Sequence, residues 1–143
     1  MTREEIFRDI EGTLGVVPTM FKAVPSDTLE LEWNLFKRVQ LNEETLPAKY
    51  RELVGLAAGA ALGDPYCVLA HRELAKVCGA TEEEIECAIR LAKGVAGWGT
   101  YMRGLDLSIE DFRGEIGQVC NFVRTTQVGG VGLEAPAAGV AKH

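Results

Sequence analysis

The chain has 143 residues, which is enough for one globular domain and too few for two of ordinary size. Apolar residues make up 47% and charged residues 25%, a composition typical of a soluble globular protein and too apolar for a disordered one. The formal charge is −6 and no cluster of Lys and Arg stands out, so we expect no nucleic-acid surface. The longest apolar run, residues 53–62, is too short to cross a bilayer, so we expect no membrane span.

The first residues lack the basic start and apolar core of a signal peptide, which predicts a cytoplasmic protein with free thiols. No two cysteines are spaced as CxxC. Three cysteines lie in apolar helical patterns, and we expect them in the core: Cys78, Cys87 and Cys120. The fourth, Cys67, differs because it lies at the start of a predicted helix.

The first third of the chain predicts two helices. Thr2 and Glu5 form a capping-box pattern for a helix to about residue 10. An apolar loop follows over residues 12–25. Asp27 and Glu30 form the same pattern for a second helix to about residue 40, whose apolar residues keep helical spacing.

Two further helices are predicted with almost no chain between them. Pro47 suits the first turn of a helix rich in Ala and Gly, and Gly63 is typical of its C-terminal cap. Asp64 is a favoured N-cap and Pro65 a favoured first residue for the next helix, which Gly79 ends.

The last third predicts two more helices. Thr81 with Glu84 begins a helix to about residue 93, and Ser108 with Asp111 begins one through about residue 123. The segment between them is broken by glycines and could hold a short helix.

No strand pattern of any length appears, so the predicted class is all-α. We expect one helical domain over residues 1–126 and a flexible Gly/Ala-rich tail over residues 127–143.

The segment DPYCVLAH, residues 64–71, carries the candidate site. Cys67 and His71 are four residues apart, so they share one face of the helix. Cys67 also lies near the unpaired N–H groups and positive dipole end of the helix, which favours the reactive thiolate. Asp64 has the opposite effect, because a carboxylate one turn away raises the pKa of the thiol. The sequence leaves open which effect is larger.

Glu52 is a further candidate, because it could meet His71. If the two helices fold back across Gly63, Glu52 lies about 16 Å before the turn and His71 about 12 Å after it. The two side chains then reach nearly the same height, and Glu52 could orient or charge His71.

Each candidate also has a purely structural interpretation. Cys67 could be a packed core thiol, His71 a satisfied histidine, Glu52 a solvated carboxylate and Asp64 only a helix cap. A metal site from Asp64, Cys67 and His71 is disfavoured, because metal-binding spacings usually pair more Cys or His. We expect no metal and no cofactor.

Residues 51–88, RELVGLAAGAALGDPYCVLAHRELAKVCGATEEEIECA, resemble the carboxymuconolactone decarboxylase / alkylhydroperoxidase D-like superfamily. The shared features are RELV before an Ala/Gly-rich helix, then GxPYCxxxH, GAT and EEI. The earlier loop GVVPTMFKAVP also resembles the opening segment of many members. The resemblance covers about residues 12–102 and implies an all-helical bundle built on a helical hairpin, usually assembled as trimers or hexamers.

In peroxidase-type members the motif is E-x11-C-x2-C-x3-H, in which peroxide attacks the second cysteine and the first resolves it. The resemblance assigns the Glu and His to a proton relay. Glu52, Cys67 and His71 match the motif, whereas Asp64 stands where the resolving cysteine would be. A sulfenic acid on Cys67 would need another thiol, and Cys78 lies about 16 Å away along the same helix, too far for a disulfide.

The leading hypothesis is therefore a thiol-dependent antioxidant protein with alkylhydroperoxidase or peroxiredoxin-like activity and an atypical DxxC in place of CxxC. Cys67 would be the nucleophile, His71 the base and Glu52 its orienting residue, with Asp64 as a cap or proton relay. The reducing thiol would come from a neighbouring subunit or from an external thiol.

Two alternatives stay open. Decarboxylase-type members lack the cysteine pair and work through acid/base groups, so the site also suits a decarboxylase or isomerase of a small carboxylated compound. His71 and Asp64 would then act, and Cys67 would only pack. The other alternative is a non-catalytic oligomer that binds a ligand.

All three hypotheses share the expectation of a homo-oligomer with at least three chains. The short chain leaves a thin core, and the Gly/Ala-rich residues 55–61 favour close helix packing, within or between subunits. Three large aromatic side chains could be buried at such an interface: Trp33, Phe36 and Trp98.

Overall fold

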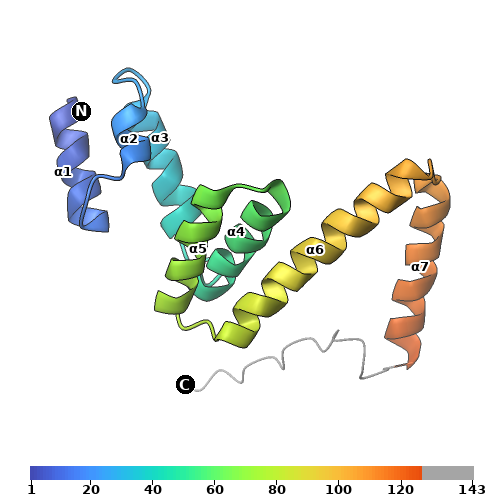
Figure 1. The fold of residues 1–143 in the computed structure, drawn as a ribbon. Coiled ribbons are helices and arrows are strands. Elements are labelled where there is room, and N and C mark those ends of the chain that lie inside the picture. The colour runs from blue at the N-terminus through green and yellow to red at the C-terminus, as the bar shows by residue number, and fades with distance from the viewer. Residues whose placement is uncertain (127–143) are drawn as a thin grey trace. The chain divides into compact units, whose positions relative to one another are not determined.

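The computed structural model describes residues 1–126, and its regular elements over this range are all helical (Figure 1). In chain order they are α1 (Arg3–Leu14), α2 (Thr19–Ala23), α3 (Leu29–Phe36), the π-helix η1 (Lys37–Leu41), α4 (Ala48–Leu62), α5 (Pro65–Val77), α6 (Glu82–Gly104) and α7 (Ile109–Thr126). Because these residues contain no strand, the predicted all-α class is confirmed. The predicted tail, residues 127–143, lies outside the described part of the chain.

The chain divides into two compact units, one from Met1 to Gly97 and the other beginning at Trp98. No helix within residues 1–126 is both long enough and apolar enough to cross a membrane.

The N-terminal helices pack around a cluster of aromatic side chains. Phe21 meets the ring of Trp33 edge-on at 5.3 Å, and Phe36 stacks on Trp33 at 5.7 Å. The indole N–H of Trp33 donates to Asp9 at 2.7 Å, which satisfies the polar group of this buried ring. The expectation that Trp33 lies at an interface between subunits is therefore wrong, because it is 1% exposed within its own chain.

Capping explains where several helices begin. Thr2 and Glu5 form the predicted capping box of α1, although the helix runs one turn further than expected, to Leu14. Thr81 and Glu84 form the same reciprocal bonds before α6. The capping prediction for the second helix is wrong: Thr28, and not Asp27, precedes α3, and its side chain makes no capping bond.

Helices α4 and α5 form the predicted hairpin and lie side by side (Figure 1). Gly63 ends α4 with a φ of 70°, a left-handed conformation that glycine adopts without strain. Asp64 then caps α5 and Pro65 is its first residue, as expected. Leu56 of α4 and Ala75 of α5 are fully buried against Ile85 of α6, which forms the second core cluster.

Helix α6 is longer than the sequence predicts, because it continues past residue 93 through a run of glycines to Gly104. Each glycine costs a helix only about 0.5–1 kcal/mol relative to alanine, and the segment contains no proline to stop it.

The prediction that three cysteines lie in the core is wrong for the single chain. Cys87 and Cys120 are exposed, and Cys78 is only partly buried. The buried residues of α6 are Ile85, Ala88 and Ala92, and Cys87 points off that face. Cys120 is exposed because none of the residues of α7 is buried.

Candidate active site

The α4–α5 hairpin brings Glu52 and His71 into direct contact. Nδ1 of His71 lies 2.8 Å from Oε2 of Glu52, so the prediction from helix geometry that these side chains meet is confirmed. A carboxylate can only accept, so the imidazole donates its Nδ1 proton and a neutral ring presents the lone pair of Nε2. Within residues 1–126, Nε2 has no hydrogen-bond partner of its own. The pair therefore has the arrangement of an oriented acid/base group.

Arg51 supports this pair from the other side and was missed by the sequence reasoning. Its Nε lies 3.3 Å from Oε1 of Glu52, and its Nη1 donates to the carbonyl of Asn42 at 3.1 Å. A buried carboxylate is costly unless it is paired, and Glu52 is only 4% exposed. Arg51 and His71 together provide those partners. The only signal in the sequence was a cation next to Glu52, and neighbours along a helix do not usually face each other.

Two glycines of α4 make the contact between the helices possible. A Cβ at Gly55 would lie 2.6 Å from ring atoms of His71, so only glycine leaves room for the imidazole. A Cβ at Gly59 would lie 3.0 Å from Cβ of Cys67 and 3.2 Å from the backbone nitrogen of Val68. The sequence left open whether the small residues of α4 serve packing within or between subunits. At Gly55 and Gly59 they serve packing within the chain.

Asp64 and Cys67 form the second half of the site. Oδ1 of Asp64 accepts the backbone N–H groups of Tyr66 at 2.9 Å and Cys67 at 3.2 Å, which caps α5. Hydrogen bonding of the Cys67 side chain to Asp64, then burial and then the negative charge of Asp64 raise the pKa of Cys67.

The same contacts act on Asp64 in the opposite direction. The bonds from the thiol and the backbone N–H of Cys67 lower the pKa of Asp64. At neutral pH the pair is therefore a thiol donating to a carboxylate. The pKa of the thiol is therefore shifted in the direction expected from Asp64.

The four predicted site residues thus form two contacting pairs on one hairpin, Glu52 with His71 and Asp64 with Cys67. All four cysteines are free thiols. Over residues 1–126, no group of three or more His, Cys, Asp or Glu is arranged to hold a metal ion.

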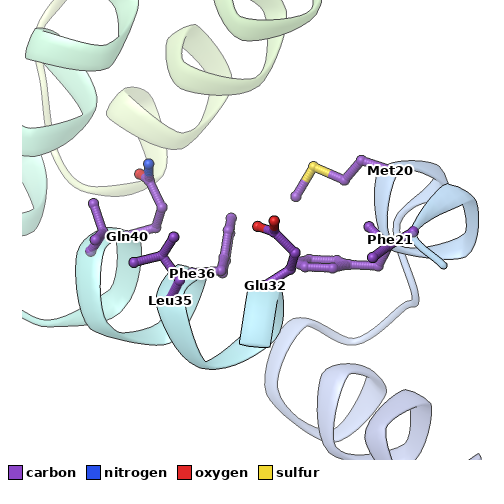
Figure 2. A pocket seen from close by; sticks show the side chains of 8 residues that line it. Met20, Phe21, Glu32, Leu35, Phe36 and Gln40 are labelled. Carbon is purple, nitrogen blue, oxygen red and sulfur yellow. The ribbon is translucent and has the colours of Figure 1, made fainter. Parts of the chain in front are cut away.

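A hollow of about 360 Å³ lies elsewhere in the first unit, between α2, α3 and η1. Figure 2 shows the carboxylate of Glu32 among the side chains of Met20, Phe21 and Phe36. None of the predicted site residues lines this hollow.

Comparison with known proteins agrees with this fold and hairpin. The model of the carboxymuconolactone decarboxylase family matches residues 23–109, a range that contains all of α4, α5 and α6. A solved structure of the alkylhydroperoxidase AhpD core from Rhodospirillum rubrum is 24% identical and covers 76% of this chain and 84% of its own, with a TM-score of 0.67. This likeness shows the alkylhydroperoxidase D-like helical fold. A comparison with curated proteins gives no significant match.

Proposed function

The chain belongs to the carboxymuconolactone decarboxylase family, and on that premise we propose that it is an acid/base enzyme of the decarboxylase or isomerase type. Its substrate would be a small carbonyl compound, such as a lactone or a β-keto acid. The observation that carries the proposal is the 2.8 Å contact between Nδ1 of His71 and Oε2 of Glu52. This contact supports His71 as the general acid/base, because it fixes the ring and leaves Nε2 for the substrate.

His71 and Glu52 can carry out all the proton transfers of this proposal. In an isomerisation, Nε2 of His71 takes a proton from a carbon next to the carbonyl group, and the electron pair moves into an enolate. Glu52 stabilises the imidazolium, which returns the proton to a different carbon. In a decarboxylation, carbon dioxide leaves, its bonding electrons form the enolate, and a protonated His71 supplies the proton that replaces it.

In this proposal Asp64 and Cys67 shape the site and do not attack the substrate. The raised pKa of Cys67 keeps it a neutral thiol at neutral pH, which disfavours nucleophilic attack by sulfur. The ionised Asp64 supplies a second carboxylate on the same hairpin, beside the first turn of α5.

A thiol peroxidase is the second candidate, and one observation favours it. The thiol of Cys67 bonds to the carboxylate of Asp64, which could take the proton as sulfur attacks a peroxide. The O–O bond would break, sulfur would keep one oxygen as a sulfenic acid, and the other oxygen would take the proton from Asp64 and leave as water or an alcohol. Two equivalents of an external thiol would then reduce the sulfenic acid, releasing water and a disulfide.

The test uses small lactones and β-keto acids in D2O, with deuterium incorporation and carbon dioxide release as readouts. We expect His71→Ala to reduce the rate by about 10²–10⁴-fold, the usual contribution of a general acid/base. Glu52→Gln should also slow the reaction, whereas Glu73→Gln, a control on the exposed surface of α5, should not. Cys67→Ala should stay within a few-fold of the wild type.

Two results would overturn the proposal: turnover that survives His71→Ala, or no turnover of either substrate class. A parallel assay with hydrogen peroxide and a dithiol tests the second candidate. Peroxide turnover that Cys67→Ser abolishes would establish the peroxidase in place of the acid/base enzyme.

A further inference from the structure

The guanidinium group of Arg51 is held by two contacts at once. Its Nε donates to Oε1 of Glu52 at 3.3 Å, and its Nη1 donates to the backbone carbonyl of Asn42 at 3.1 Å. The side chain is only 14% exposed, so most of it is shielded from water. Because the group is planar, two contacts on different nitrogens fix its orientation. Arg51 therefore connects the start of α4 with the segment that follows η1.

The carbonyl of Asn42 is itself placed by a turn. Oδ1 of Asn42 accepts the backbone N–H of Glu44 at 2.8 Å, which is the bond of an Asx turn. The backbone of Asn42 is extended, with a φ of −78° and a ψ of 125°, and η1 ends before it. A continuous series of contacts thus runs from this turn through Arg51 and Glu52 to Nδ1 of His71. All of these residues lie in the first unit.

The two carboxylate oxygens of Glu52 have different partners. Oε1 accepts from Arg51, and Oε2 accepts from Nδ1 of His71. The side chains of Glu52 and His71 are only 6% and 18% exposed, so water stabilises charge weakly here. A buried carboxylate is costly unless a positive charge pairs with it. Arg51 supplies that charge, and the ring of His71 can therefore stay neutral.

Other charged groups near the pair have partners or are solvated. The other cations of α4 and α5 form ion pairs of their own: Lys49 with Glu84, Arg72 with Glu82 and Lys76 with Glu73. Asp64 caps α5, and two acidic residues after η1, Glu43 and Glu44, are exposed. Among residues 1–126, Arg51 is thus the one permanently charged cation in contact with Glu52.

We propose that Arg51 is a positioning residue that keeps Nε2 of His71 unprotonated, and that the turn at residues 42–44 anchors it. Without Arg51, the ionised Glu52 and the neutral ring would carry one uncompensated negative charge, and the pair would take up a proton from water. That proton can lie on the ring, which becomes an imidazolium. It can also lie on Glu52, whose new O–H donates to Nδ1 while the proton of the ring moves to Nε2. Nε2 carries a proton in both cases.

The consequence for catalysis rests on the proposed function, in which Nε2 of His71 is the base. A protonated Nε2 has no lone pair to take a proton from a substrate. Arg51 acts through Glu52 in this scheme and does not touch the substrate.

The main experiment follows the ¹⁵N signals of His71 against pH and needs no substrate. His71→Gln identifies these signals, because the chain contains only one other histidine. Arg51→Met removes the charge and the donors but keeps a long side chain. We expect the titration of Nε2 to move to higher pH by at least about one unit, a tenfold gain in proton affinity. Arg51→Lys keeps the charge without the planar group, and its titration should lie between those of the wild type and Arg51→Met.

Two further variants separate this contact from a general effect of charge. Arg72→Met removes a cation next to His71 in the sequence, but Arg72 is 45% exposed and pairs with Glu82, so the titration should stay at the wild-type position. Asn42→Ala removes the side chain that forms the Asx turn and leaves Arg51 and Glu52 intact. It should move the titration in the same direction as Arg51→Met, by a smaller amount.

Activity gives a second measurement that a purely structural role would not change in the same way. With the carbonyl substrates, kcat of Arg51→Met at neutral pH should fall by about tenfold and recover as the pH is raised, because Nε2 then loses its proton. If the wild type turns over no such substrate but the ¹⁵N titration moves as expected, the proposed function fails and the role of Arg51 stands.

A wild-type titration in Arg51→Met, or an equal shift in Arg72→Met, would overturn the inference. Circular dichroism checks that each variant is folded. If Arg51→Met does not fold, Arg51→Lys and Asn42→Ala decide the question, and wild-type titrations in both would overturn it.

Discussion

Helices α4 and α5 form one pair joined by a short turn, and α6 and α7 form another. In the first pair, Gly55 and Gly59 let α5 approach until the ring of His71 and Cβ of Cys67 fill the space that side chains would need. In the second pair large apolar side chains such as Trp98, Phe112 and Ile116 are exposed, and no residue of α7 is buried. A short connection therefore does not by itself make two helices pack closely against each other. The size of the side chains at the contact also decides how closely the helices pack.

The close packing of α4 and α5 also matters for the chemistry of the site. The contact between Nδ1 of His71 and Oε2 of Glu52 requires the two helix axes to be held at a fixed distance, and glycine is the smallest spacer available. Bulky apolar residues at the same positions would separate the two groups. Among residues 1–126, the second pair contains no comparable contact between a histidine and a carboxylate.

The largest expected effect is on the core beneath the first pair. Leu56→Ala removes a fully buried side chain and should lower the free energy of unfolding by about 2–5 kcal/mol. Leu62→Ala, on the same helix but 83% exposed, should change it by less than about 0.5 kcal/mol. Chemical denaturation measures both. Equal effects would mean that the hairpin has no core of its own and would remove the contrast with α7.

Gly55→Ala should break the closest approach between α4 and α5. The new methyl group would meet the imidazole at 2.6 Å, so His71 must move and its bond to Glu52 is lost. A hydrogen bond to a charged group is worth about 1.5–3 kcal/mol, and a loss of this size should appear in the free energy of unfolding. The ¹⁵N shift of His71 Nδ1 reports the bond directly. An unchanged shift would show that the hairpin can widen without losing the pair.

Gly59→Ala should have a smaller effect in the same direction. Its methyl group would press on Cβ of Cys67 and on the backbone of Val68, an overpacking that costs about 1–3 kcal/mol. Gly94→Ala is the matched control in α6, since a Cβ there meets no atom within 4 Å. The control should stabilise the helix by about 0.5–1 kcal/mol. If Gly59→Ala and Gly94→Ala changed the free energy of unfolding in the same direction, the difference between the two helix pairs would be contradicted.

The smallest change concerns the charge on Asp64. Asp64→Asn keeps a favoured N-cap residue but removes the carboxylate, which through its bond to the thiol raises the pKa of Cys67 in the wild type. The pKa of Cys67 should therefore fall. The thiolate fraction at neutral pH should rise by about tenfold for each unit by which the pKa falls.

The pH dependence of iodoacetamide alkylation at Cys67, followed by peptide mass, measures this change. The profile of Asp64→Asn should lie at lower pH than that of the wild type. Asp64→Ala serves as a control that removes cap and charge together. Superimposable profiles for Asp64→Asn and the wild type would show that the carboxylate does not control the thiol.

The sequence predicted the hairpin well because its signals are local. Gly63, Asp64 and Pro65 end one helix and begin the next, and regular helix geometry then places Glu52 at the height of His71. The family resemblance pointed to the same residues.

Other features depended on contacts that no local pattern reveals. The long side chain of Arg51 reaches Glu52, and the fit of His71 against Gly55 depends on the distance between helices. The sequence predicts opposing effects on the pKa of Cys67, and the raised pKa depends on how the side chain of Asp64 lies against the thiol. Trp33 was expected at an interface because aromatic content does not say which core a ring joins.

The turn between α4 and α5 limits how this site can change through insertion and deletion. Only Gly63 and Asp64 separate the two helices, and Asp64 also contacts the thiol. One residue added within the first turn of α5 would rotate the rest of that helix by about 100° and carry His71 away from Glu52. Most surface connections absorb such changes, but this one cannot. Residues 52–71 therefore form a unit of fixed length, which would have to be transferred whole to graft the site onto another protein.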